Sequence, residues 1–234
     1  MTSMNTDFGK TNVTSKEIRS QIDIDKAISI LQDCQVDKPE KKVEDYTEQI
    51  TEKINLLPEK GRQFPWRSTE SLWRIYISEI LLQRTHGKSV ANIYDNFFEK
   101  FSNPRKIYAA EEKEIKKEVN SLGFQNKRTR TLIEVGEMLA ENNFHVPKNS
   151  KELSKPWRVG KYAANATLLF GFNCSVELVD SNVAAAAENI LDYPLSTAPH
   201  KDEEFRELMK SLTPSDPETA RAFYFAFIDF DFKS

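Results

Sequence analysis

Two residues able to share one reaction centre stand close together in the chain. Tyr162 opens a helix of small residues, Asp180 precedes another helix, and they lie 18 residues apart, the length of one helix and one loop. Both side chains can therefore face a single pocket. A carboxylate kept ionised at a helix N-terminus stabilises positive charge that develops on a substrate. The alternative for Asp180 is an ordinary N-cap aspartate.

A second carboxylate, Glu79, falls within an apolar stripe. Leu72, Ile75, Tyr76 and Leu82 surround it at helical spacing. Burial among such neighbours raises the pKa of a carboxyl group and suits it to act as a general acid. The alternative is a surface carboxylate at the margin of the stripe.

Helices are the elements that must position these residues. Apolar residues recur at helical spacing along the chain, no long alternating strand pattern is present, and there are only seven glycines. Besides the helix that Tyr162 opens, helices are expected at residues 15–35, 45–57, 71–85, 88–101, 104–110, 111–120, 126–143, 150–153, 182–191, 201–211 and 218–230. The sequence therefore predicts an all-α fold.

Composition limits the class of protein. The 234 residues suffice for one or two domains with a sizeable core. No apolar run approaches the roughly 20 residues of a membrane span, and the N-terminus lacks the apolar core of a signal peptide, so we expect a cytoplasmic protein without a membrane partner. Cys34 and Cys174 have no partner at zinc or iron–sulfur spacing, which predicts two reduced thiols and no metal site.

Charge is unevenly distributed. The net charge is −3, yet residues 100–131 hold nine Lys or Arg against four Glu, a local charge of +5. A local basic patch steers phosphates more effectively than net charge does. A solvated helix face is the alternative interpretation of the same residues.

Four short motifs occur in order between residues 57 and 228. They are FPWR at 64–67, SEILLQRT at 78–85, VGKY at 159–162 and VDSNV at 179–183. Together they resemble the helix-hairpin-helix (HhH-GPD) DNA glycosylase superfamily, which includes endonuclease III, adenine glycosylases and thymine-mismatch glycosylases. Each motif alone is weak, and four at compatible spacing are specific.

The resemblance implies two helical subdomains with the active site in the cleft between them. The expected central subdomain spans residues 71–181 and holds the DNA-binding helix-hairpin-helix at about 150–165. Residues 45–70 and 182–234 are expected to form the terminal subdomain. Residues 1–44 form an N-terminal extension outside the resemblance, either an arm that binds a partner or a cap on the helical core.

The resemblance also implies a DNA N-glycosylase. Asp180 matches the catalytic aspartate that stabilises the sugar cation or activates water. In relatives that also cut the strand through a Schiff base, a lysine stands at the position of Tyr162, and a tyrosine cannot form an imine. A monofunctional enzyme without AP-lyase activity is therefore expected. Glu79 matches the acid that protonates a departing purine, but thymine-specific relatives keep it too, so it does not select adenine.

Base flipping gives further residues an expected role. The target base must leave the stack to be reached. Arg84 matches the residue that fills the hole left by the flipped nucleotide, and Gln83 is expected to line the pocket. Arg128, with Lys127 and Arg130, is expected to contact the DNA backbone, and helix-surface solvation is the alternative.

The predicted hairpin keeps part of the family motif. The amides of Val159, Gly160 and Lys161 are expected to hold a phosphate, often with a monovalent cation bridging carbonyls and phosphate. The first glycine of the family hairpin is replaced by Arg158, and its proline by Trp157. A bulky residue where glycine allows positive φ is expected to distort the turn, and Arg158 is expected to compensate as an additional phosphate contact.

Two other departures concern cofactor and substrate. The four-cysteine loop that follows the last helix in many relatives is missing before Ser234, as is the domain that recognises 8-oxoguanine. No iron–sulfur cluster is therefore expected. Four alanines at 184–187 replace a more polar helix, and their small size suggests room for a modified base.

Three hypotheses follow for a monomer in the cytoplasm, associated with the nucleoid and acting on double-stranded DNA. The first is a monofunctional glycosylase for a mismatched or modified base, nearest to the thymine-mismatch branch. The second is a glycosylase for hypermodified bases of foreign (phage) DNA. The third is a DNA-binding protein of the same fold that has lost catalysis.

Overall fold

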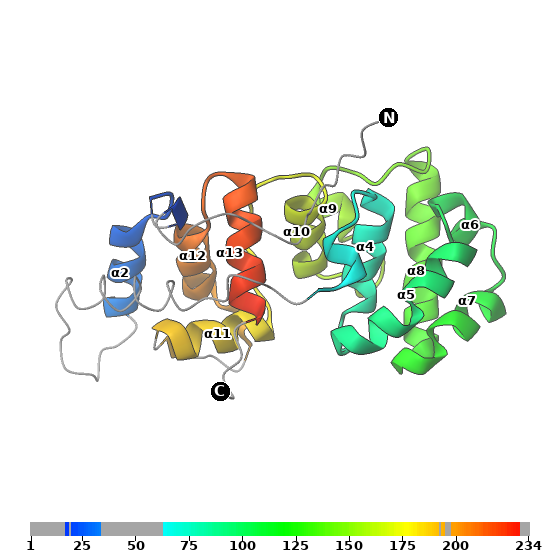
Figure 1. The fold of residues 1–234 in the computed structure, drawn as a ribbon, viewed down its shortest axis with the longest axis horizontal. Coiled ribbons are helices and arrows are strands. Elements are labelled where there is room, and N and C mark those ends of the chain that lie inside the picture. Colours follow the sequence, from blue (N-terminus) through cyan, green and yellow to red (C-terminus); the bar gives the residue numbers. More distant parts are fainter. Residues whose placement is uncertain (1–16, 19, 34–62, 192, 195–197, 230–234) are drawn as a thin grey trace. The chain divides into compact units, whose positions relative to one another are not determined.

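The computed structural model describes residues 17–18, 20–33, 63–191, 193–194 and 198–229. Across these residues the regular secondary structure is helical and contains no strand, which confirms the predicted all-α class (Figure 1). The linker expected after the first helix and the helix expected at 45–57 lie outside the described residues.

The chain divides into two compact units. One is residues 63–172, and the other combines 1–62 with 173–234. The chain passes from the first unit to the second after residue 172. The subdomain boundary expected from the resemblance lies after residue 181. Ser175 Oγ donates a hydrogen bond to the Pro214 carbonyl at 2.6 Å, so the loop before Asp180 is tied to the C-terminal helices.

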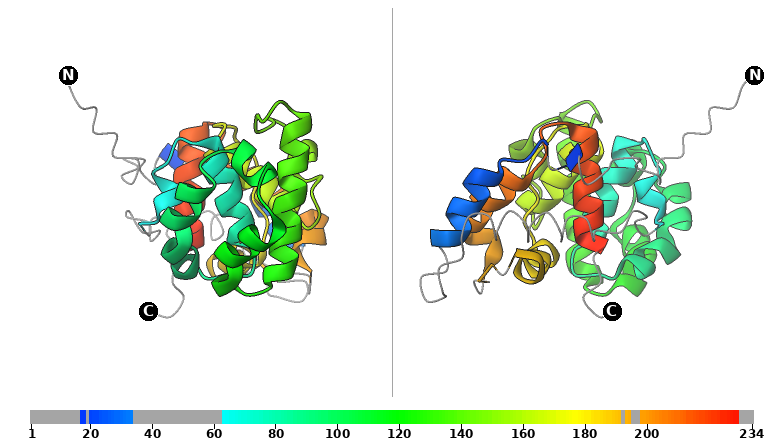
Figure 2. Two further views of the ribbon diagram at one scale, coloured as in Figure 1. Left: turned by 90° about the vertical axis from the view of Figure 1, so that its right-hand side faces the viewer. Right: turned by 60° about the vertical axis from the view of Figure 1, so that its left-hand side comes forward.

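The unit of residues 63–172 is built around two helix packings. Helix α8 packs against α6 and α7, and α10 packs against α4 and α9 (Figure 2). The helices are α4 (Leu72–Leu81), α5 (Gly87–Lys100), α6 (Pro104–Tyr108), α7 (Glu112–Val119), α8 (Gln125–Glu141), α9 (Ser150–Leu153) and α10 (Lys161–Phe170), with 3-10 turns η1 (Pro65–Arg67) and η2 (Asn120–Leu122). Tyr76 is fully buried, and its hydroxyl donates to the Leu153 carbonyl at 2.7 Å, so a buried polar tip joins α4 to α9.

Side-chain caps explain where several of these helices begin. The side-chain oxygens of Ser71, Asn103 and Asn149 accept backbone N–H groups at the starts of α4, α6 and α9. Such caps satisfy amides that have no partner within the helix. Short polar residues before apolar runs therefore position the helices that carry Glu79 and the hairpin.

The second unit joins the two ends of the chain. Its elements are α2 (Ile24–Asp33), α11 (Ser181–Leu191), η3 (Pro199–Lys201), α12 (Glu203–Leu212) and α13 (Pro217–Asp229). Helix α2 packs against α12, and α11 packs against α13. The core of this unit is rich in aromatic side chains, including Phe205, Phe223 and Phe227.

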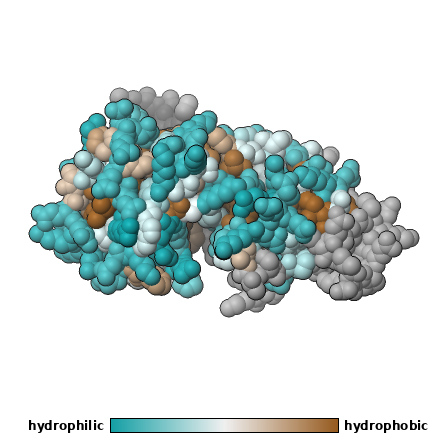
Figure 3. All heavy atoms as spheres, turned by 180° about the vertical axis from the view of Figure 1, so that it is seen from behind, coloured by the Kyte–Doolittle hydropathy of each residue, from teal (hydrophilic) through white to brown (hydrophobic). Residues whose placement is uncertain are grey.

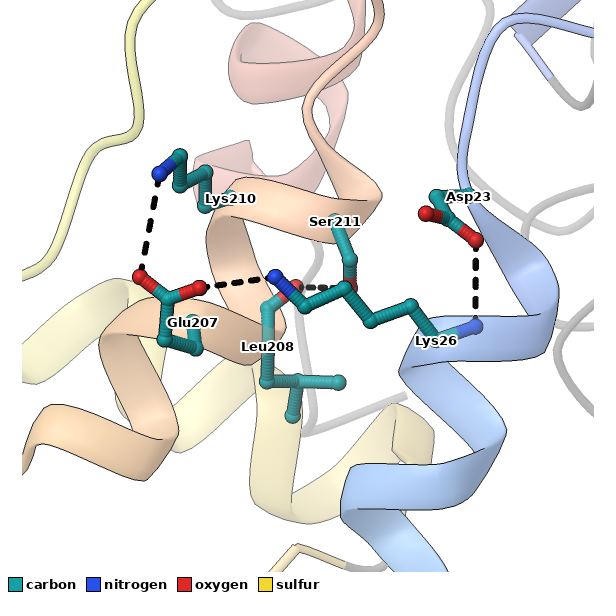
Figure 4. A network of polar contacts seen from close by, with 6 residues as sticks. All are labelled: Asp23, Lys26, Glu207, Leu208, Lys210 and Ser211. Atoms are coloured by element: carbon teal, nitrogen blue, oxygen red, sulfur yellow. Dashed lines mark hydrogen bonds and ion pairs between the residues drawn. The ribbon is translucent and has the colours of Figure 1, made fainter.

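The predicted N-terminal helix is interrupted. A turn at residues 20–22 interrupts the single helix expected over 15–35, and Asp23 then caps α2 by accepting the Lys26 N–H at 3.1 Å. Lys26 Nζ lies 2.7 Å from Glu207 on α12 (Figure 4). Between the two interpretations of the N-terminal extension, residues 24–33 behave as a cap on the helical core.

The face shown in Figure 3 is mainly hydrophilic where it is formed by described residues, with small separate apolar areas. None of the helices within the described ranges is long and apolar enough to cross a membrane.

Candidate active site and nucleic-acid interface

Asp180 lies at the N-terminus of α11, as predicted. Its Oδ1 accepts the backbone N–H groups of Asn182 and Val183 at 2.9 and 2.8 Å, and its Oδ2 accepts the Asn182 side-chain amide at 3.2 Å. Burial raises the pKa of Asp180, the three hydrogen bonds lower it, and the net shift is upward. The expected ionisation of Asp180 stays a prediction, because burial raises its pKa while the hydrogen bonds at the helix terminus lower it. The orientation of the carboxylate is set by the protein itself.

The hairpin connects α9 to α10. Gly160 is the N-cap of α10 with φ −80°, and a Cβ built there meets no protein atom within 4 Å. Val159 is buried and its backbone N–H donates to the Pro156 carbonyl at 3.0 Å. This amide was expected to hold a phosphate, but its hydrogen bond is used within the turn. Lys161 is exposed whereas Tyr162 is half-buried, so their side chains differ in surroundings.

Arg158 takes the backbone conformation that the missing glycine would allow. Its φ is +66°. The preceding Trp157 donates its N–H to Glu134 Oε2 on α8 at 2.6 Å, and Arg130 Nε lies 2.9 Å from Glu134 Oε1. Arg158 therefore adopts positive φ itself, beside a turn anchored to α8.

The end of α4 presents the residues expected to act in base flipping. Glu79 is 5% exposed, so the alternative of a surface carboxylate is wrong. Gln83 is half-buried and Arg84 is exposed, with φ +54°. The chain therefore leaves α4 through a strained residue whose side chain lies in solvent.

Arg128 does not occupy the surface position expected of a DNA contact. It is 7% exposed, and burial lowers the pKa of its guanidinium. Nη1 donates to the Leu81 carbonyl at 2.9 Å, Nη2 donates to the Gln83 carbonyl at 2.8 Å and to Thr85 Oγ1, and Nε donates to the Gly123 carbonyl at 3.0 Å. The expected phosphate contact is corrected to a structural role, because the donors satisfy carbonyls at the C-terminal end of α4.

Phe124 is a candidate that the sequence motifs did not single out. It is 56% exposed, has φ +49°, and follows Gly123, whose carbonyl accepts the Arg128 guanidinium. Through Arg128 its loop is joined to the segment of Gln83. A large exposed ring beside that segment is suited to contact bases, and the sequence signal was its place directly after a helix-ending glycine.

The sequence profile of the HhH-GPD superfamily of base excision DNA repair proteins matches residues 77–215, more than half of the chain. The chain belongs to this superfamily. The predicted resemblance is therefore confirmed. The residues expected to take part in catalysis or DNA binding lie in both units. All of them except Asp180 lie in the unit of residues 63–172, and Asp180 lies in the other unit. A shared pocket for Tyr162 and Asp180 remains a prediction.

This HhH-GPD protein is 31% identical over 189 residues to the thymine/uracil-DNA glycosylase of Pyrobaculum aerophilum, a match that covers 80% of this chain and 82% of that protein. Its fold is similar to that of a thermostable thymine-DNA glycosylase, with a TM-score of 0.66, 25% identity and coverage of 92% of this chain and 86% of that one. Endonuclease III in a non-covalent complex with DNA shares the fold, with a TM-score of 0.64, 19% identity and coverage of 83% and 90%. These similarities support a DNA glycosylase of the superfamily that binds DNA.

Metal ligands are not grouped in the part of the HhH-GPD protein that the structure describes. No three His, Cys, Asp or Glu side chains there are placed to hold a metal ion. Cys174 is half-buried and forms no disulfide.

Proposed function

We propose that this protein is a monofunctional DNA glycosylase that hydrolyses the N-glycosidic bond of a mismatched thymine or uracil in double-stranded DNA. The observation that carries the proposal is the Asp180 carboxylate, held by two backbone amides at the start of α11 in a chain of this superfamily. Similarity to the thymine/uracil-DNA glycosylase of Pyrobaculum aerophilum supports the choice of base.

Asp180 would act on the sugar. As the C1′–N bond breaks, the base leaves with the bonding electrons and positive charge builds on the sugar ring. A preorganised carboxylate beside C1′ stabilises that charge and orients water. Water then supplies hydroxide to C1′ and a proton to the base, which leaves an abasic site. Oδ2 of Asp180 is the candidate atom, because Oδ1 already accepts two amides.

Tyr162 would separate this enzyme from those that also cut the strand. It is the second residue of α10, the position at which a lysine would form an imine with the sugar. A phenol has no amine to form that bond, so the reaction would stop at the abasic site.

The remaining site residues would flip and hold the nucleotide. Arg84 is exposed where the chain leaves α4, so its side chain is available to fill the space of the flipped base. The buried Glu79 on α4 and Gln83 just after that helix would line the pocket. Glu79 is the candidate general acid, which would pass a proton to the leaving base and regain it from the attacking water.

The hairpin would hold the DNA backbone. Gly160 leaves open space at the start of α10, where helix N–H groups bind phosphate, and the exposed Lys161 adds charge. Arg158 would add a contact from the turn. A monovalent cation bridging hairpin carbonyls and phosphate, and catalysis without an iron–sulfur cluster, belong to this proposal.

The alternative substrate, a hypermodified base, is suggested by the altered hairpin and by the alanines at 184–187, and only the alanines lose weight. Ala184, Ala186 and Ala187 are almost completely buried, in a helix that packs on α13. Their burial supports a role for their small size in close helix packing.

The test is release of free bases from a panel of duplexes with T:G, U:G, A:G and fully paired sites, with mass spectrometry of the products. Thymine or uracil released from the G mismatches, with strands left uncut, is the expected result. Binding to the same duplexes with no release of any base would favour the non-catalytic alternative.

A further inference from the structure

Two guanidinium groups converge on one indole beside the hairpin turn. The guanidinium carbons of Arg130 and Arg158 lie 4.4 and 5.2 Å from the ring centroid of Trp157. Arg130 comes from α8 and Arg158 from the turn before α10. Both arginines are exposed and Trp157 is half-buried. Cation–π contacts with the indole limit the directions in which both charges point.

One carboxylate organises this cluster without neutralising it. Glu134 accepts a hydrogen bond from the backbone N–H of Trp157 at 2.6 Å and one from Nε of Arg130 at 2.9 Å. Burial raises the pKa of Glu134, but the bonds to Trp157 and Arg130 and the Arg130 charge bring it below its ordinary value. Arg158 forms no ion pair with any residue in the described ranges. Two positive groups and one negative group leave a net charge of +1 at this point.

The positive φ of Arg158 indicates that its side chain has a functional role. An L residue at φ +66° is strained, and glycine would adopt the same conformation without strain. Strain kept at an exposed turn is a pointer to function, because the fold itself would be better served by glycine.

We propose that the cluster of Arg130, Trp157 and Arg158 binds a backbone phosphate of duplex DNA, adjacent to the phosphate expected at Gly160. The inference rests on the proposed function, because it extends the DNA surface of that same site. Guanidinium groups offer paired N–H donors that match phosphate oxygens. The cluster adds affinity and not base selectivity, since phosphates carry no sequence information.

The test measures DNA affinity of the full chain by fluorescence anisotropy over a series of NaCl concentrations. The probe is a labelled duplex with a tetrahydrofuran abasic analogue opposite G. The double variant Arg130→Gln, Arg158→Gly should bind about tenfold more weakly at low salt, and the slope of log K against log [NaCl] should become shallower by about 0.9, the value for one phosphate. The single variant Arg158→Gly should lose affinity without losing thermal stability.

Arg105→Gln is the matched control. Arg105 also stacks on an aromatic ring, with its guanidinium carbon 4.1 Å from the Phe144 centroid, but on α6. Its removal changes the net charge of the protein as much as Arg158→Gly does and should leave the slope unchanged. A wild-type slope for the double variant, or an equal loss in Arg105→Gln, would overturn the inference.

Base release from the mismatched duplexes separates this inference from the proposed function. If wild type releases base and the double variant keeps the wild-type slope of log K against log [NaCl], only the phosphate site is contradicted. A wild-type protein that releases nothing, while the slopes differ as expected, contradicts the proposed catalysis and supports the surface.

Discussion

The Nη2 atom of Arg128 donates a hydrogen bond to the carbonyl oxygen of Gln83 at 2.8 Å. This bond joins α8 to the residue directly before Arg84, which is exposed at φ +54°. The same guanidinium reaches the carbonyls of Leu81 and Gly123. The segment expected to replace a flipped base is thus held by a buried arginine that does not need to touch DNA.

Replacing Arg128 should destabilise the fold. We expect Arg128→Met to lower the free energy of unfolding by about 3 kcal/mol, because buried carbonyls lose charged donors. Urea unfolding measures this, with the exposed neighbour Lys127→Met as a control that should change stability by less than about 0.5 kcal/mol. In Arg128→Lys, the salt dependence of DNA binding should match wild type. If Arg128→Met were as stable as wild type and its DNA affinity depended less steeply on salt, the result would favour a direct contact between Arg128 and phosphate.

Gly160→Ala should separate folding from DNA binding. The added Cβ meets no protein atom within 4 Å and φ is −80°, so the free energy of unfolding should change by less than about 1 kcal/mol. Affinity for an abasic-analogue duplex should fall about tenfold if phosphate approaches this backbone closely. Titration calorimetry measures the affinity, and unchanged binding would show that no phosphate lies against Gly160.

Tyr162 should determine whether a covalent intermediate forms. Borohydride treatment of wild type with a mismatched or abasic duplex should trap no protein–DNA adduct. Tyr162→Lys should give an adduct, since the positive end of the α10 dipole lowers the pKa of an amine and leaves more of it neutral. Tyr162→Phe is the control and should give none. A strong adduct with wild type would contradict the monofunctional assignment.

Glu134 should make the stability of the hairpin depend on pH. The pKa of Glu134 in the folded protein is below the ordinary value of 4.5. The ionised carboxylate therefore stabilises the fold at pH values above 4.5, and this contribution is lost as the pH falls through the folded pKa. Glu134→Gln should therefore be less stable than wild type at neutral pH, by about 1 kcal/mol or less at this partly exposed site, and equally stable in acid. Thermal melts across pH measure the difference, and a constant gap would refute this linkage.

Asp180→Asn should not weaken the fold. The pKa of Asp180 is raised, so the folded state binds a proton more tightly than the unfolded state, and ionisation reduces stability as pH rises above the unfolded value. Asparagine caps a helix about as well as aspartate and carries no charge. Thermal melts at neutral pH should show the variant at least as stable as wild type, and equal to it at pH values below the unfolded pKa. A large loss of stability at neutral pH would mean that Asp180 is chiefly a structural cap.

Local signals in the sequence predict most helices well. The helix expected at 182–191 starts beside the observed α11, since the residues at its start cap it locally. The single helix expected over 15–35 is interrupted at residues 20–22, because Asp23 caps a new helix that packs on α12. Apolar spacing did not reveal that competition, as the partner helix is distant in sequence.

Arg128 shows why part of the candidate site could not be predicted. Its polar side chain on a helix is compatible with solvent or with burial, and the acceptor at Leu81 is 47 residues away. The alanines at 184–187 are similar, since small size suits an open pocket or a tight helix contact. The apolar neighbours of Glu79 place it on the stripe but are also compatible with a surface carboxylate, and only the structure shows that it is buried.

The most direct test of the account is single-turnover release of thymine and uracil from T:G and U:G duplexes by wild type and by Asp180→Asn, with DNA affinity measured in parallel. We expect wild type to release the base and the variant to bind the same duplexes within about threefold of wild type while its rate falls by at least about a thousandfold. Base release by Asp180→Asn at the wild-type rate would contradict the role of this carboxylate as the catalytic group.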